Sequence, residues 1–231
     1  MAILDMNEEL AGELVKEYPD NTKFFETNVL ETESIQKAID GTNAWIKETG
    51  YPLGGVVAAA GVSTPAKIID RNGKPFNLDD FDFVMNVNVR GTIDLIRLAL
   101  PTLVGQEPVG EDGERGVLIM VASSAAFDGQ PGQVAYAASK GAVASLTLPL
   151  TRDLARYGVR VVTIAPSLFE SGMTKMMSDK VRKSLERVME FPRREGKPHE
   201  FAMTVRHSIE NTMLNGTVIR LDGGMRMPSK M

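Results

Sequence analysis

The stretch VLIMVASSAAFDGQPGQVAYAASKGA (117–142) contains an apolar run, a polar loop and the start of a helix. Its first six residues place apolar side chains on both faces of a strand, as a strand covered by helices on each side requires. Two serines follow directly, and residues Val134–Tyr157 have the apolar spacing of a long helix. A buried strand that leads into a helix is the basic unit of an α/β fold.

The same alternation recurs along the 231 residues. Short apolar runs predict strands at Ala2–Leu4, Lys23–Phe25, Gly55–Ala60, Val117–Ala122, Val159–Ala165 and Thr217–Leu221. Longer amphipathic runs predict helices at Glu8–Glu17, Glu33–Lys47, Leu78–Leu98, Val134–Tyr157, Asp179–Met189 and Glu200–Thr212. This order predicts an α/β, Rossmann-like, doubly wound parallel sheet with right-handed crossovers. No linker interrupts it, so we expect a single domain over residues 1–231.

Composition excludes several classes of function. The net charge is -4, so no overall basic field draws the chain to nucleic acid or to lipid headgroups. There are no cysteines, which rules out disulfides and thiolate metal sites. His199 and His207 lack an acidic partner at ligand spacing, so we expect no metal. No apolar run approaches the ~20 residues of a membrane span.

Small and polar residues follow the predicted strands. They include Asp5 after the first strand, AAAG (58–61) after the third, the serines 123–124 after the fourth and PSLFES (166–171) after the fifth. Each is an ordinary way to end a strand. Because the carboxyl ends of parallel strands meet at one edge of the sheet, the four together predict a ligand site there.

Tyr136 and Lys140 are four residues apart on one predicted helix and therefore share a face. An ammonium ~4 Å from a phenolate stabilises it by about 4 kcal/mol at an effective dielectric of ~20, which makes the phenol a usable acid–base group. The loop from Ser123 can place its hydroxyl beside the phenol. On its own, a Tyr-x-x-x-Lys pair is also typical of an ordinary helix surface, and Ser123 of a turn.

With these residues in place, the chain resembles the short-chain dehydrogenase/reductases. Ser123, Tyr136 and Lys140 match the family's catalytic residues, and Asn88 in FDFVMNVNVRGT (81–92) matches the asparagine that completes the tetrad. The resemblance implies that Tyr136 is the acid/base, that Lys140 lowers its pKa and holds the nicotinamide ribose, and that Ser123 orients the reacting oxygen. It further implies that Asn88 holds the active-site helix and a proton-relay water.

The resemblance also implies the cofactor residues and the cofactor. Asp5 matches the acid that hydrogen-bonds the adenosine ribose, and a carboxylate there repels a 2′-phosphate, so NAD is expected rather than NADP. An alternative interpretation makes Asp5 a helix N-cap. The remaining cofactor contacts implied are Asn28, Val29, Ala59, Gly61, Tyr136, Lys140, Pro166, Leu168 and Phe169.

The stretches 123–142, 146–169 and 214–227 are most similar to the branch that oxidises 3-hydroxyacyl-CoA and hydroxysteroids. An NAD-dependent enzyme acting on a hydrophobic secondary alcohol, assembled as a dimer or tetramer, is the function implied, in mitochondria or alternatively in the cytoplasm. Two other functions are a noncatalytic scaffold derived from the family and an acyl-carrier-protein reductase. Apolar residues at helical spacing serve an oligomer interface or the core: Leu95, Leu98, Ala142 and Leu146.

Residues 171–196 are rich in methionine and in basic side chains. They line an acyl or steroid pocket and meet CoA phosphates, or they form an amphipathic surface helix. The apolar set is Met173, Met176, Met177, Val181, Leu185 and Met189, and the basic set is Lys175, Lys180, Lys183 and Arg187.

The chain departs from the family pattern at its start. In the family, a first strand, a glycine-rich turn that binds pyrophosphate and a first helix precede the stretch that ILD (3–5) matches. Either Met1 is not the natural start, or the chain is a genuine short form. In the chain as given, we expect Ala2–Leu4 and Gly55–Ala60 either to shift together by about 4.8 Å or to leave an open gap. We also expect NADH affinity at least about a hundredfold below that of an extended chain, equivalent to about 2.7 kcal/mol.

Three further departures are single residues. Ala58 stands where the family has asparagine, Asn28 where it has the adenine-binding aspartate, and Ser167 where it has glycine. The last of these substitutions is expected to tighten the nicotinamide pocket.

Overall fold

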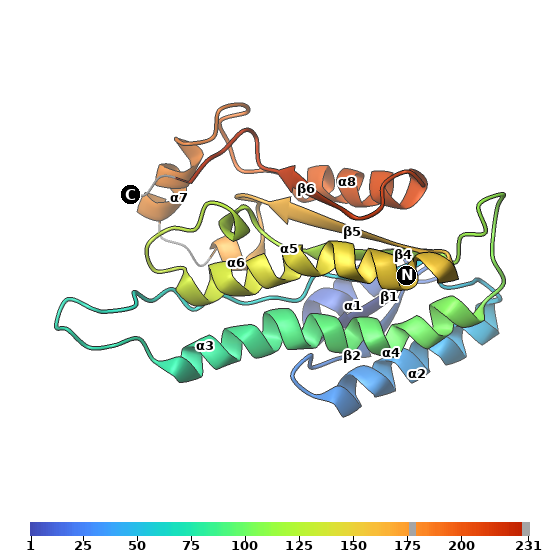
Figure 1. The fold of residues 1–231 in the computed structure, drawn as a ribbon. Coiled ribbons are helices and arrows are strands. Elements are labelled where there is room, and N and C mark those ends of the chain that lie inside the picture. Colours follow the sequence, from blue (N-terminus) through green and yellow to red (C-terminus); the bar gives the residue numbers. More distant parts are fainter. Residues whose placement is uncertain (176–178, 228–231) are drawn as a thin grey trace.

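The computed structural model describes residues 1–175 and 179–227 (Figure 1). Its strands are β1 (Ala2–Asp5), β2 (Lys23–Glu26), β3 (Gly55–Ala58), β4 (Gly116–Val121), β5 (Val159–Pro166) and β6 (Thr217–Leu221). Its α-helices are α1 (Glu8–Glu17), α2 (Thr32–Thr49), α3 (Leu78–Met85), α4 (Thr92–Gly105), α5 (Val134–Leu154), α6 (Gly172–Lys175), α7 (Asp179–Glu186) and α8 (Pro198–Glu210). Each predicted strand and helix is present, with ends that differ by a few residues.

Shorter helical segments complete the fold. A π-helix, η1 (Asn86–Gly91), joins α3 to α4, so the predicted helix Leu78–Leu98 is three segments that continue to Gly105. The 3₁₀ turns η2 (Ser124–Ala126) and η3 (Ala155–Tyr157) lie on either side of α5. A π-helix inside a longer helix often marks a functional site.

The described strands pair in parallel, which confirms the predicted α/β, Rossmann-like fold. They form two ladders, however, and not one continuous sheet. One has the order β3-β4-β5-β6, and the other consists of β1 and β2. Among the described strands, β1 and β3 share no ladder, so the direct pairing of these two strands is not formed.

Helix packing fixes the position of the β1–β2 pair. Ile35 and Ile39 of α2 are buried against Ala99 of α4, and Leu4 of β1 and Val56 of β3 contact the same cluster. The two-stranded ladder is therefore held beside the four-stranded one by side chains, because no backbone hydrogen bonds join β1 to β3.

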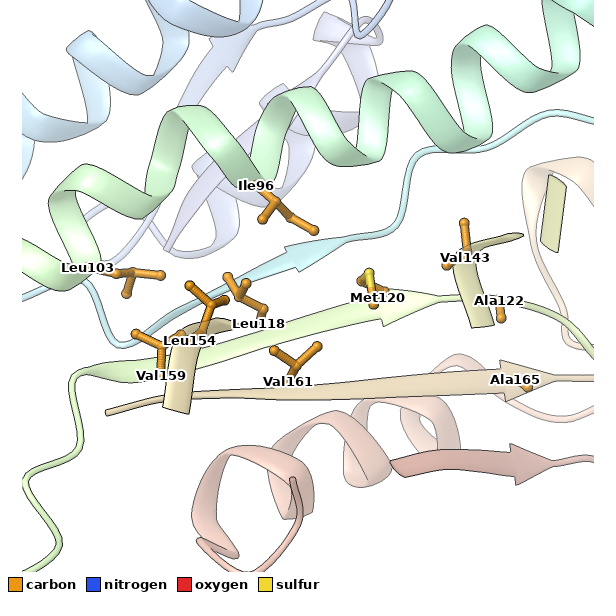
Figure 2. Close-up of a cluster of buried hydrophobic side chains, with 10 residues drawn as sticks. All are labelled: Ile96, Leu103, Leu118, Met120, Ala122, Val143, Leu154, Val159, Val161 and Ala165. Carbon is orange, nitrogen blue, oxygen red and sulfur yellow. The ribbon is translucent and has the colours of Figure 1, made fainter. Parts of the chain in front are cut away.

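Helices cover both faces of the central strands. Leu118 and Met120 of β4 and Val161 of β5 pack towards Ile96 and Leu103 of α4 (Figure 2). The alternate residues Val117 and Ile119 face the other way and pack with Phe201 and Val205 of α8. This two-sided burial explains the continuously apolar sequence of β4 and β5.

Candidate active site

The site forms at the carboxyl ends of the parallel strands, as predicted. Ser123 follows β4 and lies 6% exposed, and Pro166 ends the neighbouring strand β5. Backbone pairing continues past the end of β4, where the Ala122 amide donates to the Ile164 carbonyl at 2.8 Å. The ends of the two strands are therefore held together where the site lies.

Ser123 and Tyr136 are brought together by the loop between β4 and α5. The Ser123 backbone is extended (φ -164°), and its hydroxyl accepts a hydrogen bond from the Ala125 amide at 3.1 Å, which caps η2. Burial raises the pKa of Tyr136, and interaction with the same Ser123 side chain acts in the opposite direction.

Lys140 lies one helical turn after Tyr136 on α5 and is 4% exposed. Its Nζ donates to the Val121 carbonyl at 2.8 Å and lies 5.9 Å from the centroid of the Tyr136 ring. Burial lowers the pKa of Lys140 to about 8. In this arrangement burial is the largest influence on the Tyr136 pKa and raises it, so the lowering of that pKa by Lys140 stays a prediction.

Asn88 is fully buried within the π-helix η1. Its Oδ1 accepts from the Val62 amide at 2.7 Å, and its Nδ2 donates to the Val62 carbonyl and to Ser139 Oγ, both at 2.9 Å. Ser139 Oγ in turn donates to the Tyr136 carbonyl at 2.8 Å. The side chain thus links the segment after β3 to the helix that carries Tyr136.

Ser139, which was not among the predicted residues, joins Asn88 to the backbone of Tyr136. It lies in AYAASKGA (135–142), three residues after Tyr136, where i,i+3 spacing could have indicated it. Gly61 completes this side of the site, because a Cβ there would lie 3.2 Å from Lys140 Nζ and 3.3 Å from Asn88 Oδ1. The small residue lets the backbone approach both polar groups.

The residues expected around adenosine lie at the ends of β1 and β2. Asp5 is exposed, and its Oδ1 accepts from the Asn7 amide at 2.8 Å. The N-cap of α1 is Asn7 and not Asp5, since Asn7 Oδ1 accepts from the Leu10 amide at 3.0 Å. Asn28 uses both ends of its amide within its own turn: Nδ2 donates to Glu31, and Oδ1 accepts from the Leu30 amide.

Val29 lies against η1. A Cβ on Gly91 would come within 2.9 Å of the Val29 Cβ, so the glycine allows this close approach. The turn expected to meet adenine therefore rests directly on the π-helix that carries Asn88.

The expected nicotinamide residues follow β3 and β5. Ala59 is exposed, and Leu168 is buried beside the half-exposed Pro166 and Phe169. Ser167 Oγ is buried and has no hydrogen-bond partner among the described residues. An unpaired hydroxyl at this position is a group that a polar ligand could satisfy.

Part of the expected substrate segment is packed as core. Leu185 and Met189 are buried with Leu168 and Met225 rather than lining an open space. The exposed Lys183 and Arg187 border a surface hollow of about 360 Å³ with Glu186 and Arg193. Residues 176–178 and the side chains of Met173, Lys175, Lys180 and Val181 lie outside the described part of the structure.

Residues 1–175 and 179–227 hold no group of three histidine, cysteine or acidic side chains placed to bind a metal ion. Within the same ranges, no helix has the length and apolar character needed to cross a membrane.

Comparison with known proteins extends the resemblance beyond the tetrad. The sequence profile of the short chain dehydrogenases matches residues 1–182. A 3-hydroxyacyl-CoA dehydrogenase type-2 of Drosophila melanogaster is 40% identical over 226 residues, which span 97% of this chain and 87% of that protein. The protein of the same name from Rattus norvegicus is 43% identical over 213 residues, or 92% and 80% of the two chains.

Solved structures share the fold. A 3-hydroxyacyl-CoA dehydrogenase type-2 from Mycobacterium avium superposes with a TM-score of 0.91 at 33% identity, covering 99% of this chain and 87% of that one. A 7α-hydroxysteroid dehydrogenase complexed with NADH and a 7-oxo bile acid has a TM-score of 0.84 at 19% identity, covering 98% and 84%, and supports the fold alone. With the strand-end site and the Ser123–Tyr136 pair, these matches show that the chain belongs to the short-chain dehydrogenase family, whose members are NAD(P)-dependent oxidoreductases.

Proposed function

We propose that this protein is an NAD-dependent dehydrogenase that interconverts a secondary alcohol and a ketone, with a 3-hydroxyacyl-CoA or a related hydrophobic alcohol as substrate. The observation that carries the proposal is the Tyr136 phenol within the influence of Ser123 and beside the buried Lys140 ammonium, at the carboxyl ends of the central strands. The named relatives support the substrate class.

The hydrogen-bond donors of Lys140 fit the binding of a dinucleotide. Among the described residues, Lys140 Nζ donates one hydrogen bond, so two of the three ammonium donors remain for ribose hydroxyls. We propose that Asp5, Asn28 and Val29 hold the adenosine end and that Ala59, Gly61, Pro166, Leu168 and Phe169 surround the nicotinamide end. Because its amide is engaged within the turn, Asn28 acts by shaping that turn. Bound NAD would supply the hydride-accepting carbon.

The chain's own groups move the proton. A raised pKa keeps the Tyr136 phenol protonated at neutral pH, which suits donation to the oxygen of a ketone during reduction. In the oxidative direction the phenolate must take the hydroxyl proton, so oxidation should accelerate as the pH rises. Ser123 hydrogen-bonds the same oxygen, and Asn88 holds α5 and a relay water in place.

The apolar cluster and the basic hollow support a long thioester substrate. Leu168 belongs both to the expected nicotinamide pocket and to the cluster with Met225, which brings apolar surface to the reacting end. Lys183, Arg187 and Arg193 are the described cations that would meet CoA phosphates.

Turnover assays test the proposal. We expect oxidation of a 3-hydroxyacyl-CoA with NAD at a higher kcat/KM than with NADP, because Asp5 repels a 2′-phosphate. Tyr136→Phe should reduce turnover at least about a hundredfold while NADH binding, followed by calorimetric titration, stays nearly unchanged. Tyr157→Phe, at the other end of the same helical region, serves as the control. Wild-type turnover in Tyr136→Phe would refute the role of Tyr136, and a better kcat/KM with NADP would refute that of Asp5.

We further propose that the protein forms a homo-oligomer through the face that α3, η1 and α4 share with α5. Leu95, Leu98 and Leu146, for which an interface or a core role was expected, are partly buried and pack against the core clusters. Ile93, 40% exposed, borders a hollow of about 380 Å³ on this face, and Leu148 on α5 is 45% exposed. These side chains are the better candidates for a partner contact.

Light scattering tests the assembly. The wild type should exceed the 25.2 kDa of one chain, and Ile93→Lys should shift it towards that mass. Met203→Lys, a substitution of an exposed methionine on α8, should leave the mass unchanged. A wild-type monomer would contradict the proposal.

A further inference from the structure

Arg220 on β6 joins segments that are far apart in the sequence. Its Nε donates to Asp222 Oδ2 at 2.6 Å, and its Nη2 donates to Asp128 Oδ2 at 2.5 Å and to the Met225 carbonyl at 3.2 Å. The guanidinium carbon also lies 5.2 Å from the centroid of the Phe127 ring. One side chain thus contacts both the loop after β4 and the segment after β6.

The first of these segments carries Ser123. The amides of Phe127 and Asp128 both donate to the Ser124 carbonyl at 3.0 Å, so Asp128 closes the turn that Ser123 begins. A contact that holds Asp128 in place therefore also holds this turn in place. The far end of the loop is held separately, where the Ala66 amide donates to the Gly132 carbonyl at 2.9 Å.

The second segment packs over the expected nicotinamide side. Asp222 Oδ1 accepts from the Gly224 amide at 3.1 Å, and Asp222 Oδ2 also accepts from Arg226 at 3.0 Å. These contacts shape the turn that leads to Met225, which is fully buried in the cluster with Leu168.

The geometry of Arg220 requires a guanidinium. Two acids and a carbonyl are contacted from two nitrogens, Nε and Nη2, and the side chain is 22% exposed while that of Asp222 is 9% exposed. A lysine presents one nitrogen and cannot reproduce the planar fork. Partial burial makes these charge-assisted hydrogen bonds stronger than those of a surface ion pair.

We infer that Arg220 is a positioning residue for the active site: it holds the Asp128 end of the serine turn against β6, and so fixes the Ser123 hydroxyl towards Tyr136. Through Asp222 and Met225 it ties the segment that packs on Leu168 to the same point. The inference rests on the proposed roles of Ser123 and Tyr136. It adds to that proposal that Arg220, on the edge strand β6, determines the position of the Ser123 side chain.

Fluorine NMR of protein labelled with 3-fluorotyrosine tests the inference without requiring turnover. The chain has four tyrosines, and Tyr136→Phe assigns the resonance of interest. Since the interaction with Ser123 acts to lower the pKa of Tyr136, Ser123→Ala should raise that pKa. Arg220→Met should raise it in the same direction, by roughly half a pKa unit, and should cause no further rise in the Ser123→Ala background.

Further variants complete the design. Asp128→Asn keeps Arg220 bound to Asp222 and decides the matter if Arg220→Met fails to fold; it should raise the pKa of Tyr136 as well. Arg220→Lys should fall between the wild type and Arg220→Met. Arg206→Met removes an exposed arginine paired with Glu210 on α8 and should leave the titration unchanged.

Two results would overturn the inference. One is a Tyr136 titration in Arg220→Met and Asp128→Asn that matches the wild type while Ser123→Ala shifts it. The other is an equal shift by Arg220→Met with and without Ser123, which would mean that the effect does not pass through Ser123. A wild type without dehydrogenase activity would count against the proposed function alone, because the titration reads the Ser123–Tyr136 contact directly.

Discussion

At the scale of single residues, burial determines the protonation of the site. Both Tyr136 and Lys140 lie where water is largely excluded, so each is displaced towards its neutral form. The phenol is kept protonated, while the ammonium is kept charged only up to a pH of about 8. Among the described residues Lys140 has no carboxylate partner, so its burial costs stability, and we attribute this cost to its proposed role in binding ribose.

The pH dependence of stability measures that cost. Between about 8 and 10.5 the unfolded chain holds a proton on Lys140 that the folded chain has lost, so the free energy of unfolding of the wild type rises with pH in this window. Below about 8 the full cost remains. Lys140→Met removes it, so the variant's stability relative to the wild type should fall by up to about 3 kcal/mol from pH 7 to pH 10.5.

Urea unfolding at both pH values provides the measurement. The lost hydrogen bond to Val121 affects both conditions alike and leaves the pH difference intact. Lys67→Met, at an exposed lysine, should show no such trend. The same stability difference at pH 7 and pH 10.5 would mean that Lys140 is not desolvated as described.

At the scale of secondary-structure elements, the π-helix joins the catalytic and adenosine sides of the site. One residue of η1, Asn88, bonds both the segment after β3 and α5. Another, Gly91, allows Val29 in the turn after β2 to pack closely against η1. Arg90 reaches the same turn through the Leu30 carbonyl and Thr32 hydroxyl, at 3.4 and 3.3 Å. The local irregularity in the helix thus places its neighbouring residues against different parts of the site.

Removal of the Asn88 amide should loosen this junction. Asn88→Ala leaves the Val62 backbone and Ser139 without their buried partner, and we expect a loss of about 3 kcal/mol in the free energy of unfolding. Asn77→Ala removes a single exposed N-cap bond to Asp79 and should cost about 1 kcal/mol. Denaturant unfolding of both variants makes the comparison, and equal losses would contradict the clamping role of Asn88.

At the scale of the whole molecule, the two ladders differ in how they are held. Strands β4 and β5 each have a neighbour on both sides and are buried on both faces. The β1–β2 pair has no fully buried residue and is attached through α2 and α4. Local opening of this pair exposes less apolar surface than opening of the central strands.

Native-state hydrogen exchange should reveal the difference. We expect the amides of β1 and β2 to exchange at least about a hundred times faster than those of β4 and β5, which corresponds to about 2.7 kcal/mol in opening free energy. Strand β6, an edge of the four-stranded ladder, provides an internal reference. Comparable protection in both ladders would show that the molecule opens as one unit.

The sequence by itself determined the elements and the placement of Ser123, Tyr136 and Lys140. Apolar periodicity gives strands and helices because it records which faces are buried, and i,i+4 spacing is a property of the helix alone. The convergence of the strand ends follows in turn from the parallel order, which the alternation of strands and helices implies.

Only the tertiary structure decided the division into two ladders, the π-helix at Asn88, the contact of Ser139 and the clamp at Arg220. The clamp joins residues 92 positions apart in the sequence, and the β1–β2 pair is placed by the packing of α2 on α4. The direction of the Tyr136 pKa shift is also decided only by the tertiary structure. Spacing on a helix indicates which groups are neighbours, but the free energy of a charge depends on how much water the rest of the fold excludes.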